Sequence, residues 1–283
     1  MKVSFFPGCS LEGTAREYGE SIDSVCRGLG IELEELKDWT CCGASSAHST
    51  NEFLSIALPA RNLARAERMK QDLITPCAAC FSRLRTTAEA LTGSKKQGVK
   101  IPFNNDISVL HILEFLLKNE FTEKIQEKIK KPLTGLKAVS YYGCLLARPP
   151  KITKEEHWED PKGLDALMTR LGAESIYWPY KTECCGGSLV LTNLEIEHRL
   201  VGRILDMAVE AEADCIVTAC PLCQSNIDTR EEEIGAARGM TYDHPIFYFT
   251  ELMGLAFGSK DTDTWFKRHI IDPRPLLQSK GLM

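Results

Sequence analysis

Short apolar runs alternate along the chain with longer segments of helical periodicity. Runs that are apolar enough for buried strands of a parallel sheet lie at residues 3–6, 31–33, 73–75, 138–142, 175–178 and 215–218. Between them, apolar residues recur at helical spacing, for example in 53–60 and 200–208. This alternation predicts an α/β fold in which small, mostly parallel sheets are covered by helices.

Two polar tetrapeptides predict where helices begin. Residues 49–52 read STNE and residues 192–195 read TNLE, so in each a Ser or Thr stands three residues before a Glu. This is the capping-box pattern, and it precedes both helical segments. Pro59 lies within the first segment, where we expect it to kink or break the helix.

The cysteines reveal an internal duplication. Ten of the 12 cysteines form one pattern that occurs twice: a single cysteine, a CCG segment and a CxxC pair. The gap between the CCG cysteines and the CxxC pair is 34 residues in both copies, whereas the first gap is 31 residues in one copy and 39 in the other. The first copy contains Cys9, Cys41, Cys42, Cys77 and Cys80, and the second contains Cys144, Cys184, Cys185, Cys220 and Cys223.

The similarity between the halves extends beyond the cysteines. Residues 3–9 read VSFFPGC and residues 139–144 read VSYYGC. We therefore predict two homologous domains related by internal pseudo-symmetry, 1–131 and 136–283. A charged segment followed by a proline and a glycine marks the boundary between them. The longer first gap of the second copy predicts a loop insertion around 148–161.

The composition limits the class of protein. With 43% hydrophobic and 26% charged residues, the chain has a globular rather than a disordered composition. The net charge of −5 disfavours a nucleic-acid-binding protein. No apolar run approaches the length of a membrane-spanning helix, and the N-terminus lacks the pattern of a signal peptide. We expect a cytoplasmic protein with no transmembrane segment.

Clustered cysteines in a reducing compartment are typical of metal ligands or redox centres. Soft thiolates suit zinc or iron–sulfur clusters, and either kind of site takes four of them. Each copy carries five, so either one cysteine is spare or the cluster is not an ordinary cubane. Both copies keep the fifth cysteine, which favours an unusual iron–sulfur cluster. Zinc, or a thioredoxin-like use of the CxxC pairs, is the alternative.

With these spacings the chain resembles the tandem cysteine-rich (CCG) domains of the heterodisulfide reductase B subunit over essentially its whole length. Other segments carry the resemblance too: WTCCGASSAH at 39–48, GCLLARPP at 143–150 and WFKRHIID at 265–272. The CCG motif alone also occurs in subunits of lactate, glycolate and glycerol-3-phosphate oxidoreductases and of some fumarate reductases. The surrounding segments and the length therefore favour the heterodisulfide reductase.

The resemblance implies a noncubane [4Fe-4S] cluster in each half, bound by all five motif cysteines of that half. It implies that the two clusters face one another across a substrate cleft and reduce the disulfide of coenzyme M and coenzyme B, a step of methanogenesis. Electrons would arrive one at a time from the ferredoxin-like C subunit and, through it, from the flavin-containing A subunit with a hydrogenase or formate dehydrogenase. An electron-transfer subunit of a lactate, glycolate or succinate/fumarate oxidoreductase is the alternative function.

Electron counting agrees with that chemistry. A disulfide takes two electrons, and two one-electron clusters in one chain could supply them. The sequence contains neither a GxGxxG fingerprint after a strand nor a Walker A motif. We therefore expect the electron donor to be another protein or subunit.

Four residues other than cysteines are candidates for substrate chemistry. His48 follows the first CCG segment and could give a proton to a departing thiolate, with a capping or structural role as the alternative. Arg83 lies one helical turn after Cys80, and Arg148 and Lys181 flank ligand segments of the second half. These cations could bind an anionic disulfide substrate, and solvated surface charges are the alternative.

The remaining features have structural interpretations. Cys26 and Cys215 fall outside the repeated pattern, and we expect them to pack as small apolar residues. The tail at 265–277 is expected to pack on its own domain rather than to dock a partner.

Overall fold

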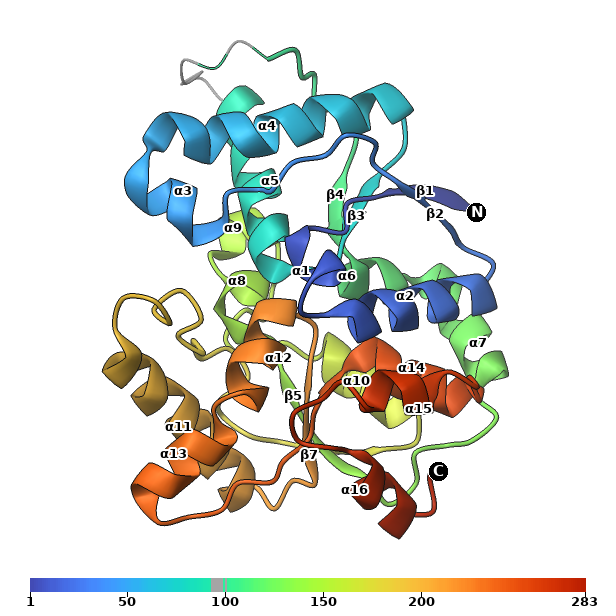
Figure 1. Ribbon diagram of the computed structural model, residues 1–283. Coiled ribbons are helices and arrows are strands. Elements are labelled where there is room, and N and C mark those ends of the chain that lie inside the picture. The colour runs from blue at the N-terminus through green and yellow to red at the C-terminus, as the bar shows by residue number, and fades with distance from the viewer. Residues whose placement is uncertain (93–98, 100) are drawn as a thin grey trace.

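Each half of the chain forms a four-stranded parallel sheet, and the two sheets have the same strand order (Figure 1). The computed structural model describes residues 1–92, 99 and 101–283. The first sheet has the order β2-β1-β3-β4 and the second β6-β5-β7-β8. The strands are β1 (Lys2–Phe5), β2 (Glu32–Glu35), β3 (Leu73–Thr75), β4 (Val109–His111), β5 (Lys137–Tyr141), β6 (Glu174–Ile176), β7 (Cys215–Thr218) and β8 (Ile246–Tyr248).

Helices follow nearly every strand. Those of the first half are α1 (Cys9–Glu12), α2 (Arg16–Gly28), α3 (Ala44–Thr50), α4 (Glu52–Met69), α5 (Ala78–Thr92), α6 (Ile112–Leu116) and α7 (Asn119–Lys128). Those of the second are α8 (Gly143–Ala147), α9 (Pro150–Thr153), α10 (Gly163–Arg170), α11 (Leu194–Glu210), α12 (Pro221–Asp228), α13 (Glu231–Arg238), α14 (Phe249–Phe257), α15 (Thr262–Phe266) and α16 (Arg274–Ser279). The predicted α/β class with two similar repeats is confirmed.

The sequence pattern placed most strands well. All residues of β3 and β7 are buried, which explains why short continuous apolar runs marked both. The strands β4 and β8 were not expected, because the apolar run of each continues directly into a helix, α6 or α14. The segment at 148–161, predicted as an inserted loop, contains the short helix α9.

The predicted capping boxes are wrong. The N-cap of α4 is Asn51, whose side chain accepts a hydrogen bond from the Leu54 N–H at 3.0 Å. Asn193 caps α11 in the same way, accepting from the Ile196 N–H at 3.1 Å. In both halves an asparagine side chain satisfies a free N–H of the first turn. It lies two residues after the expected Ser in the first half and one residue after the expected Thr in the second.

Proline also had less effect than expected. The helix α4 continues through Pro59 for 18 residues in all, so the proline does not break it. Pro59 is buried, and only one backbone donor is lost from a helix that packs along α5.

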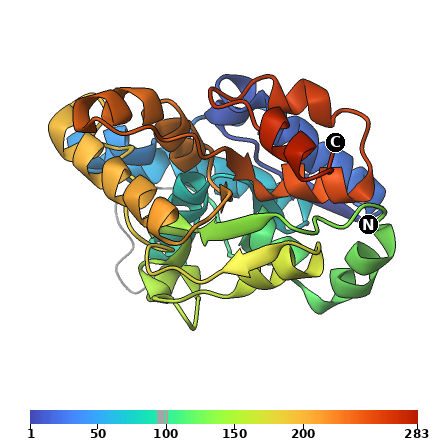
Figure 2. The same cartoon turned by 90° about the horizontal axis from the view of Figure 1, so that it is seen from below.

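The two halves share one hydrophobic core. Tyr18 and Val25 of α2, in the first half, belong to the same buried cluster as Phe247 and Trp265 in the second. The helix α2 packs against α14 and α15, and Figure 2 shows these red helices lying along the blue one. Neither half therefore buries its apolar surface alone.

The tail at 265–277 packs on its own chain, with Trp265, Phe266 and Leu277 buried in the shared core. No helix in the part of the chain that the structure describes has both the length and the apolar character needed to cross a bilayer.

Candidate iron–sulfur site

The cysteines gather at the carboxyl ends of the central strands. Cys9 begins α1 after β1, and Cys77 lies between β3 and α5. Cys144 and Cys220 follow β5 and β7 in the same way. In both sheets the strand order reverses between these two strands, and the edge of an open parallel sheet at such a point is where ligands bind.

Thiols within each half lie in contact. In the second half, the Cys144 and Cys184 sulfurs are 3.9 Å apart and the Cys185 and Cys223 sulfurs are 3.6 Å apart. In the first half the corresponding thiols are paired in the same way, Cys9 with Cys41 and Cys42 with Cys80. The structure therefore brings together the five thiols that the sequence assigned to each set.

The two sets meet where Cys77 of the first half contacts Cys220 of the second, a place we call the junction. Cys220 raises the pKa of Cys77, whereas Cys223 and Cys77 lower that of Cys220. Tyr18 of the first half reaches across and donates its O–H to the Ala219 carbonyl at 3.1 Å. Sequence reasoning did not find this contact, because it joins segments from different halves whose packing no local pattern encodes.

His111 supports the junction from the first half. Its Nε2 lies 2.9 Å from the carbonyl oxygen of Pro76, the residue before Cys77, and its Nδ1 accepts the Leu113 N–H at 3.1 Å. Because Nδ1 is an acceptor, Nε2 carries the proton and donates it to Pro76. The imidazole is fully buried, and burial lowers the pKa of His111 to about 4, so the ring is neutral.

Two glycines let the backbone approach the sulfurs closely. Gly8 and Gly143 precede the first cysteine of each set and have positive φ angles of 72° and 66°. A Cβ atom at Gly8 would lie 3.1 Å from the Cys80 sulfur, and one at Gly143 would lie 2.9 Å from the Cys223 sulfur. Glycine is needed at both positions for its conformation and for its lack of a side chain.

Backbone donors also face the sulfurs. The Gly43 N–H lies 3.4 Å from the Cys41 sulfur, and the Gly186 N–H lies 3.4 Å from the Cys184 sulfur. Such N–H groups stabilise thiolates and tune iron–sulfur centres. Within the described residues, no three His, Cys, Asp or Glu side chains surround a point as the ligands of a single metal ion do. Five thiols per half, close backbone and N–H donors fit an iron–sulfur cluster.

Each half holds a motif thiol that ionises easily. Hydrogen bonds from neighbouring thiols, above all Cys42, lower the pKa of Cys41 to about 2. In the second half the hydrogen bond with Cys144 lowers the pKa of Cys184 to about 6. These couplings favour one thiolate, the form that binds metal, in each pair, while they raise the pKa of the partner thiols Cys9 and Cys144.

The two cysteines outside the pattern behave differently. Cys26 is 1% exposed and Cys215 is fully buried, and both lie in the shared apolar core. Burial raises the pKa of Cys26 to about 12 and also raises that of Cys215. Both are packing residues, as their position outside the repeat predicted.

His48 and Arg83 line one cavity of about 440 Å³ beside α3, α4 and α5. Among the described residues, the buried Nε of Arg83 has no hydrogen-bond partner. Ser55, Thr86 and Thr87 add hydroxyl groups to the wall. A cation, an imidazole and hydroxyls can bind an anionic group, and here they share the cavity with the carboxylate of Glu52.

The other two predicted cations are held by the protein. The Lys181 side chain is buried, and its ammonium lies 2.8 Å from carboxylates of both Asp160 and Asp165. Arg148 donates to the carbonyl and hydroxyl oxygens of Thr182 at 3.1 Å and 2.5 Å. Lys181 is thus already neutralised, whereas Arg148 lies near Cys184, whose thiolate its charge favours.

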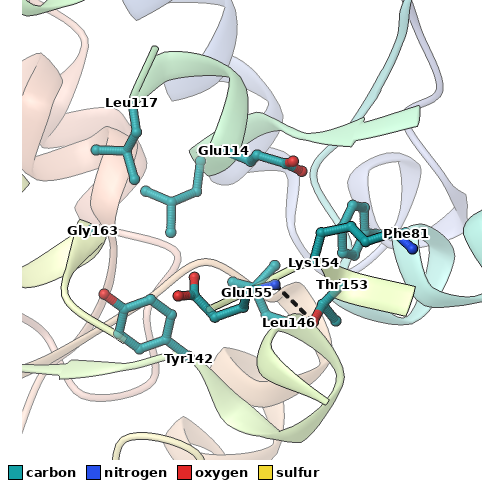
Figure 3. A pocket seen from close by; sticks show the side chains of 10 residues that line it. Phe81, Glu114, Leu117, Tyr142, Leu146, Thr153, Lys154, Glu155 and Gly163 are labelled. Carbon is teal, nitrogen blue, oxygen red and sulfur yellow. Dashed lines mark hydrogen bonds between the residues drawn. The ribbon is translucent and has the colours of Figure 1, made fainter. Parts of the chain in front are cut away.

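A smaller cavity, of about 190 Å³, lies between the halves (Figure 3). Phe81 and Glu114 line it from the first half, and Tyr142, Leu146 and Glu155 from the second. Phe81 directly follows Cys80, and Tyr142 stands two residues before Cys144. The cavity therefore adjoins ligand segments of both sets.

Comparisons with known proteins agree with this site. A family model described as a cysteine-rich domain, CCG, matches residues 3–85 and 138–228. The chain is 32% identical over 282 residues to the 8-methylmenaquinol:fumarate reductase membrane anchor subunit of Wolinella succinogenes, which covers 97% of this chain and 99% of that protein. It is 30% identical over 269 residues to the B subunit of the ferredoxin:CoB-CoM heterodisulfide reductase of Methanosarcina mazei, covering 91% and 89%.

A solved structure of a hypothetical protein from Helicobacter pylori shares the fold, with a TM-score of 0.70 at 11% identity over 96% of this chain and 52% of that one. Both of these relatives are named as subunits of reductases. The two matched segments lie one in each half and contain all ten motif cysteines. The chain belongs to the cysteine-rich CCG-domain family, with two copies of the domain, and is similar to the B subunit of heterodisulfide reductase.

Proposed function

We propose that this chain is the catalytic subunit of a heterodisulfide reductase that reduces the coenzyme M–coenzyme B disulfide to two thiols. The observation that carries the proposal is the meeting of two complete five-cysteine sets at Cys77 and Cys220. The ten motif cysteines would hold two noncubane [4Fe-4S] clusters, one per half. When bound, each cluster would supply one electron, so the pair matches the two electrons that a disulfide takes.

The residues around the thiols would bind the substrate and move protons. The cavity with Arg83 would hold an anionic group of the disulfide, and His48 in the same cavity would give a proton to a thiolate product. Arg148 would hold the second-half CCG segment through Thr182. Lys181 is left out of this role, because two carboxylates surround it.

The proposal places the chain in a cytoplasmic complex, where thiols stay reduced. The ferredoxin-like C subunit, and through it the flavin-containing A subunit, would deliver electrons. The relatives from oxidoreductase complexes support membership of such an assembly.

The test is anaerobic purification, iron and sulfide analysis, and heterodisulfide reduction with an artificial donor. We expect about eight iron atoms per chain, four for each cluster. Cys9→Ser and Cys144→Ser should each abolish turnover, because each removes one of two electron sources, while Cys26→Ala keeps its iron and its activity. A variant that lacks one cluster and keeps most of its turnover would contradict the two-cluster mechanism, and stoichiometric zinc without visible absorption would contradict the cofactor.

A second candidate is an electron-transfer subunit with no substrate of its own. The 32% identity to the fumarate reductase subunit over nearly the full length of both chains favours it. Electron paramagnetic resonance separates the two functions. If the heterodisulfide changes the spectrum of the oxidised protein, the chain binds this substrate; if it does not, while the centres still exchange electrons, the second candidate holds.

A further inference from the structure

The segment that leads into the second CCG cysteines is tied to the segment that leads into Cys144. Lys181 lies three residues before Cys184. Its carbonyl oxygen accepts the N–H groups of Tyr142 and Gly143, the two residues before Cys144, at 2.8 Å and 3.1 Å. Just beyond these hydrogen bonds, the sulfurs of Cys144 and Cys184 lie 3.9 Å apart. The position of one backbone carbonyl therefore governs how these two cysteines face each other.

The side chain of Lys181 holds that carbonyl in place. Its ammonium is buried and lies 2.8 Å from a carboxylate oxygen of Asp160 and 2.8 Å from one of Asp165. It also donates to the Pro161 carbonyl at 3.3 Å. Burial by itself lowers the pKa of Lys181, but the hydrogen bonds to the two carboxylates outweigh burial and raise it. Because a buried charge is costly unless it is paired, the lysine stays with these partners.

Tyr142 closes a ring of polar contacts around Lys181. Its hydroxyl donates to Asp165 at 3.3 Å and accepts the Leu164 N–H at 2.5 Å. Asp165 binds the Lys181 ammonium with its other oxygen, and the Lys181 carbonyl accepts the Tyr142 N–H. Tyr142 is 4% exposed and Lys181 2%, so water has little access to these bonds. We call this assembly of Tyr142, Asp160, Asp165 and Lys181 the lysine clamp.

The corresponding residues of the first half cannot build the same clamp. The residue three positions before the first CCG cysteine is Asp38, an exposed carboxylate that pairs with two arginines of α4. The place of Tyr142 is taken by Pro7, which has neither an N–H nor a hydroxyl to donate. Asp160 lies in the segment that is longer in the second half. The lysine clamp is thus specific to the second cysteine set.

We propose that Lys181 is a positioning residue for the second iron–sulfur site, where it holds Cys144 and Cys184 together as a pair of ligands. Groups behind the ligands of a metal site orient those ligands and tune the metal, and the lysine clamp lies behind two of the five cysteines. The inference rests on the proposed clusters and adds to them a residue outside the cysteine motif. It gives the buried lysine a role other than substrate binding.

The test replaces Lys181 with methionine, which keeps an unbranched side chain and removes its charge. Iron and sulfide analysis after anaerobic purification and electron paramagnetic resonance are the readouts. Lys181→Met should lower the iron content from about eight atoms per chain to about four, by loss from the second half alone. Lys162→Met is the matched control, because the exposed Lys162 also pairs with Asp160 but stands outside the clamp. It should keep both centres.

Tyr142→Phe opens the clamp without leaving a charge unpaired, so it decides the question if Lys181→Met does not fold. It should keep its iron and change the spectrum of the second-half centre. The signals are assigned by making the same changes in Cys42→Ser, where only the second-half centre is expected, and in Cys185→Ser, where only the first-half centre is expected. A merely structural lysine would lower the stability of the protein and leave the spectrum of the loaded protein unchanged.

The outcomes separate this inference from the proposed function. Full iron with unchanged spectra in Lys181→Met and Tyr142→Phe, or equal loss of iron from both halves, would overturn the role of the lysine clamp and leave the proposed function standing. A wild-type protein that loads iron but does not respond to the heterodisulfide would overturn the proposed reaction and leave the clamp standing. A wild-type protein without iron and sulfide would overturn both.

Discussion

The first half leaves Cys9 and Cys41 exposed, whereas the corresponding Cys144 and Cys184 of the second half are partly covered. Strand order is the same in the two halves, and so is the 34-residue gap between the CCG cysteines and the CxxC pair. The longer segment after Cys144 supplies Arg148, which is tied to Thr182 beside the CCG cysteines. The duplicated pattern therefore sets which cysteines are the candidate ligands, while the segments between them set how far solvent reaches each set.

A second difference concerns a glutamate that both halves keep at the start of a helix. Glu114 receives two hydrogen bonds from Arg85, at 2.8 Å and 3.0 Å. Its counterpart Glu251 is fully buried and lies 2.9 Å from His269. One half thus neutralises its carboxylate with a permanent cation and the other with a cation that can lose its proton.

The largest expected effect comes from replacing one motif cysteine in each half, which tests whether the two cysteine sets are independent and equivalent. If each set holds its own cluster, as we propose, Cys42→Ser and Cys185→Ser should each lower the iron content from about eight atoms to about four. Iron analysis and visible spectra check this. Loss of both clusters from one substitution would show that the two sets share ligands and that the predicted boundary between 1–131 and 136–283 does not separate them.

Alanine substitutions of the glycines beside the sulfurs should reduce iron binding more in the second half than in the first. Gly143→Ala places a Cβ atom 2.9 Å from the Cys223 sulfur, and Gly8→Ala places one 3.1 Å from the Cys80 sulfur, so both should reduce iron binding and Gly143→Ala should do so more. Gly30→Ala is the matched control, because Gly30 has a similar φ of 73° but no atom of the described residues lies within 4 Å of the added methyl. It should cost only about 1–2 kcal/mol of stability and no iron. Equal iron loss in all three would refute a role for close approach.

Arg85 also joins the halves. It donates to the Val109 carbonyl of the first half at 2.8 Å and to the Thr153 carbonyl of the second at 2.6 Å, in addition to Glu114. Arg85→Ala should lower the free energy of unfolding by roughly 2–4 kcal/mol, since several charge-assisted hydrogen bonds are lost at once. The exposed pair of Arg27 with Asp23 gives the control, and Arg27→Ala should cost under about 1 kcal/mol. Chemical denaturation measures both, and similar losses would contradict the bridging role.

The smallest expected effect is a pH dependence of the folding stability that arises from the second half. Burial alone lowers the pKa of His269, but the charge of Glu251 and the hydrogen bond to it outweigh burial and raise the pKa to about 9. The folded protein therefore holds the proton more tightly than the unfolded chain, and the resulting stability, complete below about pH 6.5, is lost as the pH rises through 9. Asp228 and Glu17 also face this imidazole and favour its charged form.

Thermal unfolding at pH 7 and pH 9 tests this effect. The midpoint should fall by a few degrees more in the wild type than in His269→Gln, which has no charge to lose. His157→Gln, at an exposed position, should behave as the wild type does. A His269→Gln protein with the full wild-type pH dependence would rule out this ion pair as its source.

The sequence predicts local features of the molecule but not its long-range contacts. Continuous apolar runs predicted β3 and β7, because strands buried on both faces need no polar positions. The helix α3 was missed since its residues, ASSAHST, are almost all small and polar and show no apolar stripe. The asparagine caps were missed because a serine or threonine stood nearby in an equally good pattern.

The candidate site also has features that the sequence predicts and contacts between distant segments that it does not. Spacing assigned the ten thiols to two sets, yet the junction depends on how the halves pack, and nothing local encodes that. The carboxylates around Lys181 come from the inserted segment and α10, so a charge that the sequence left free proved to be neutralised. Tyr18 and His111 carried no motif, although His111 lies where the second half has Tyr248, within a repeated segment.

The burial of α2 has a consequence for how the chain is made. Tyr18, Ile22 and Val25 are fully buried against a core that includes α14 and α15, and the Tyr18 ring stacks on Tyr248 at 4.0 Å. Because those partners lie near the C-terminus, a nascent first half leaves the ribosome with this apolar face uncovered. It must be shielded until residues 249–266 emerge. Metal loading at the junction would accordingly follow completion of translation rather than proceed one half at a time.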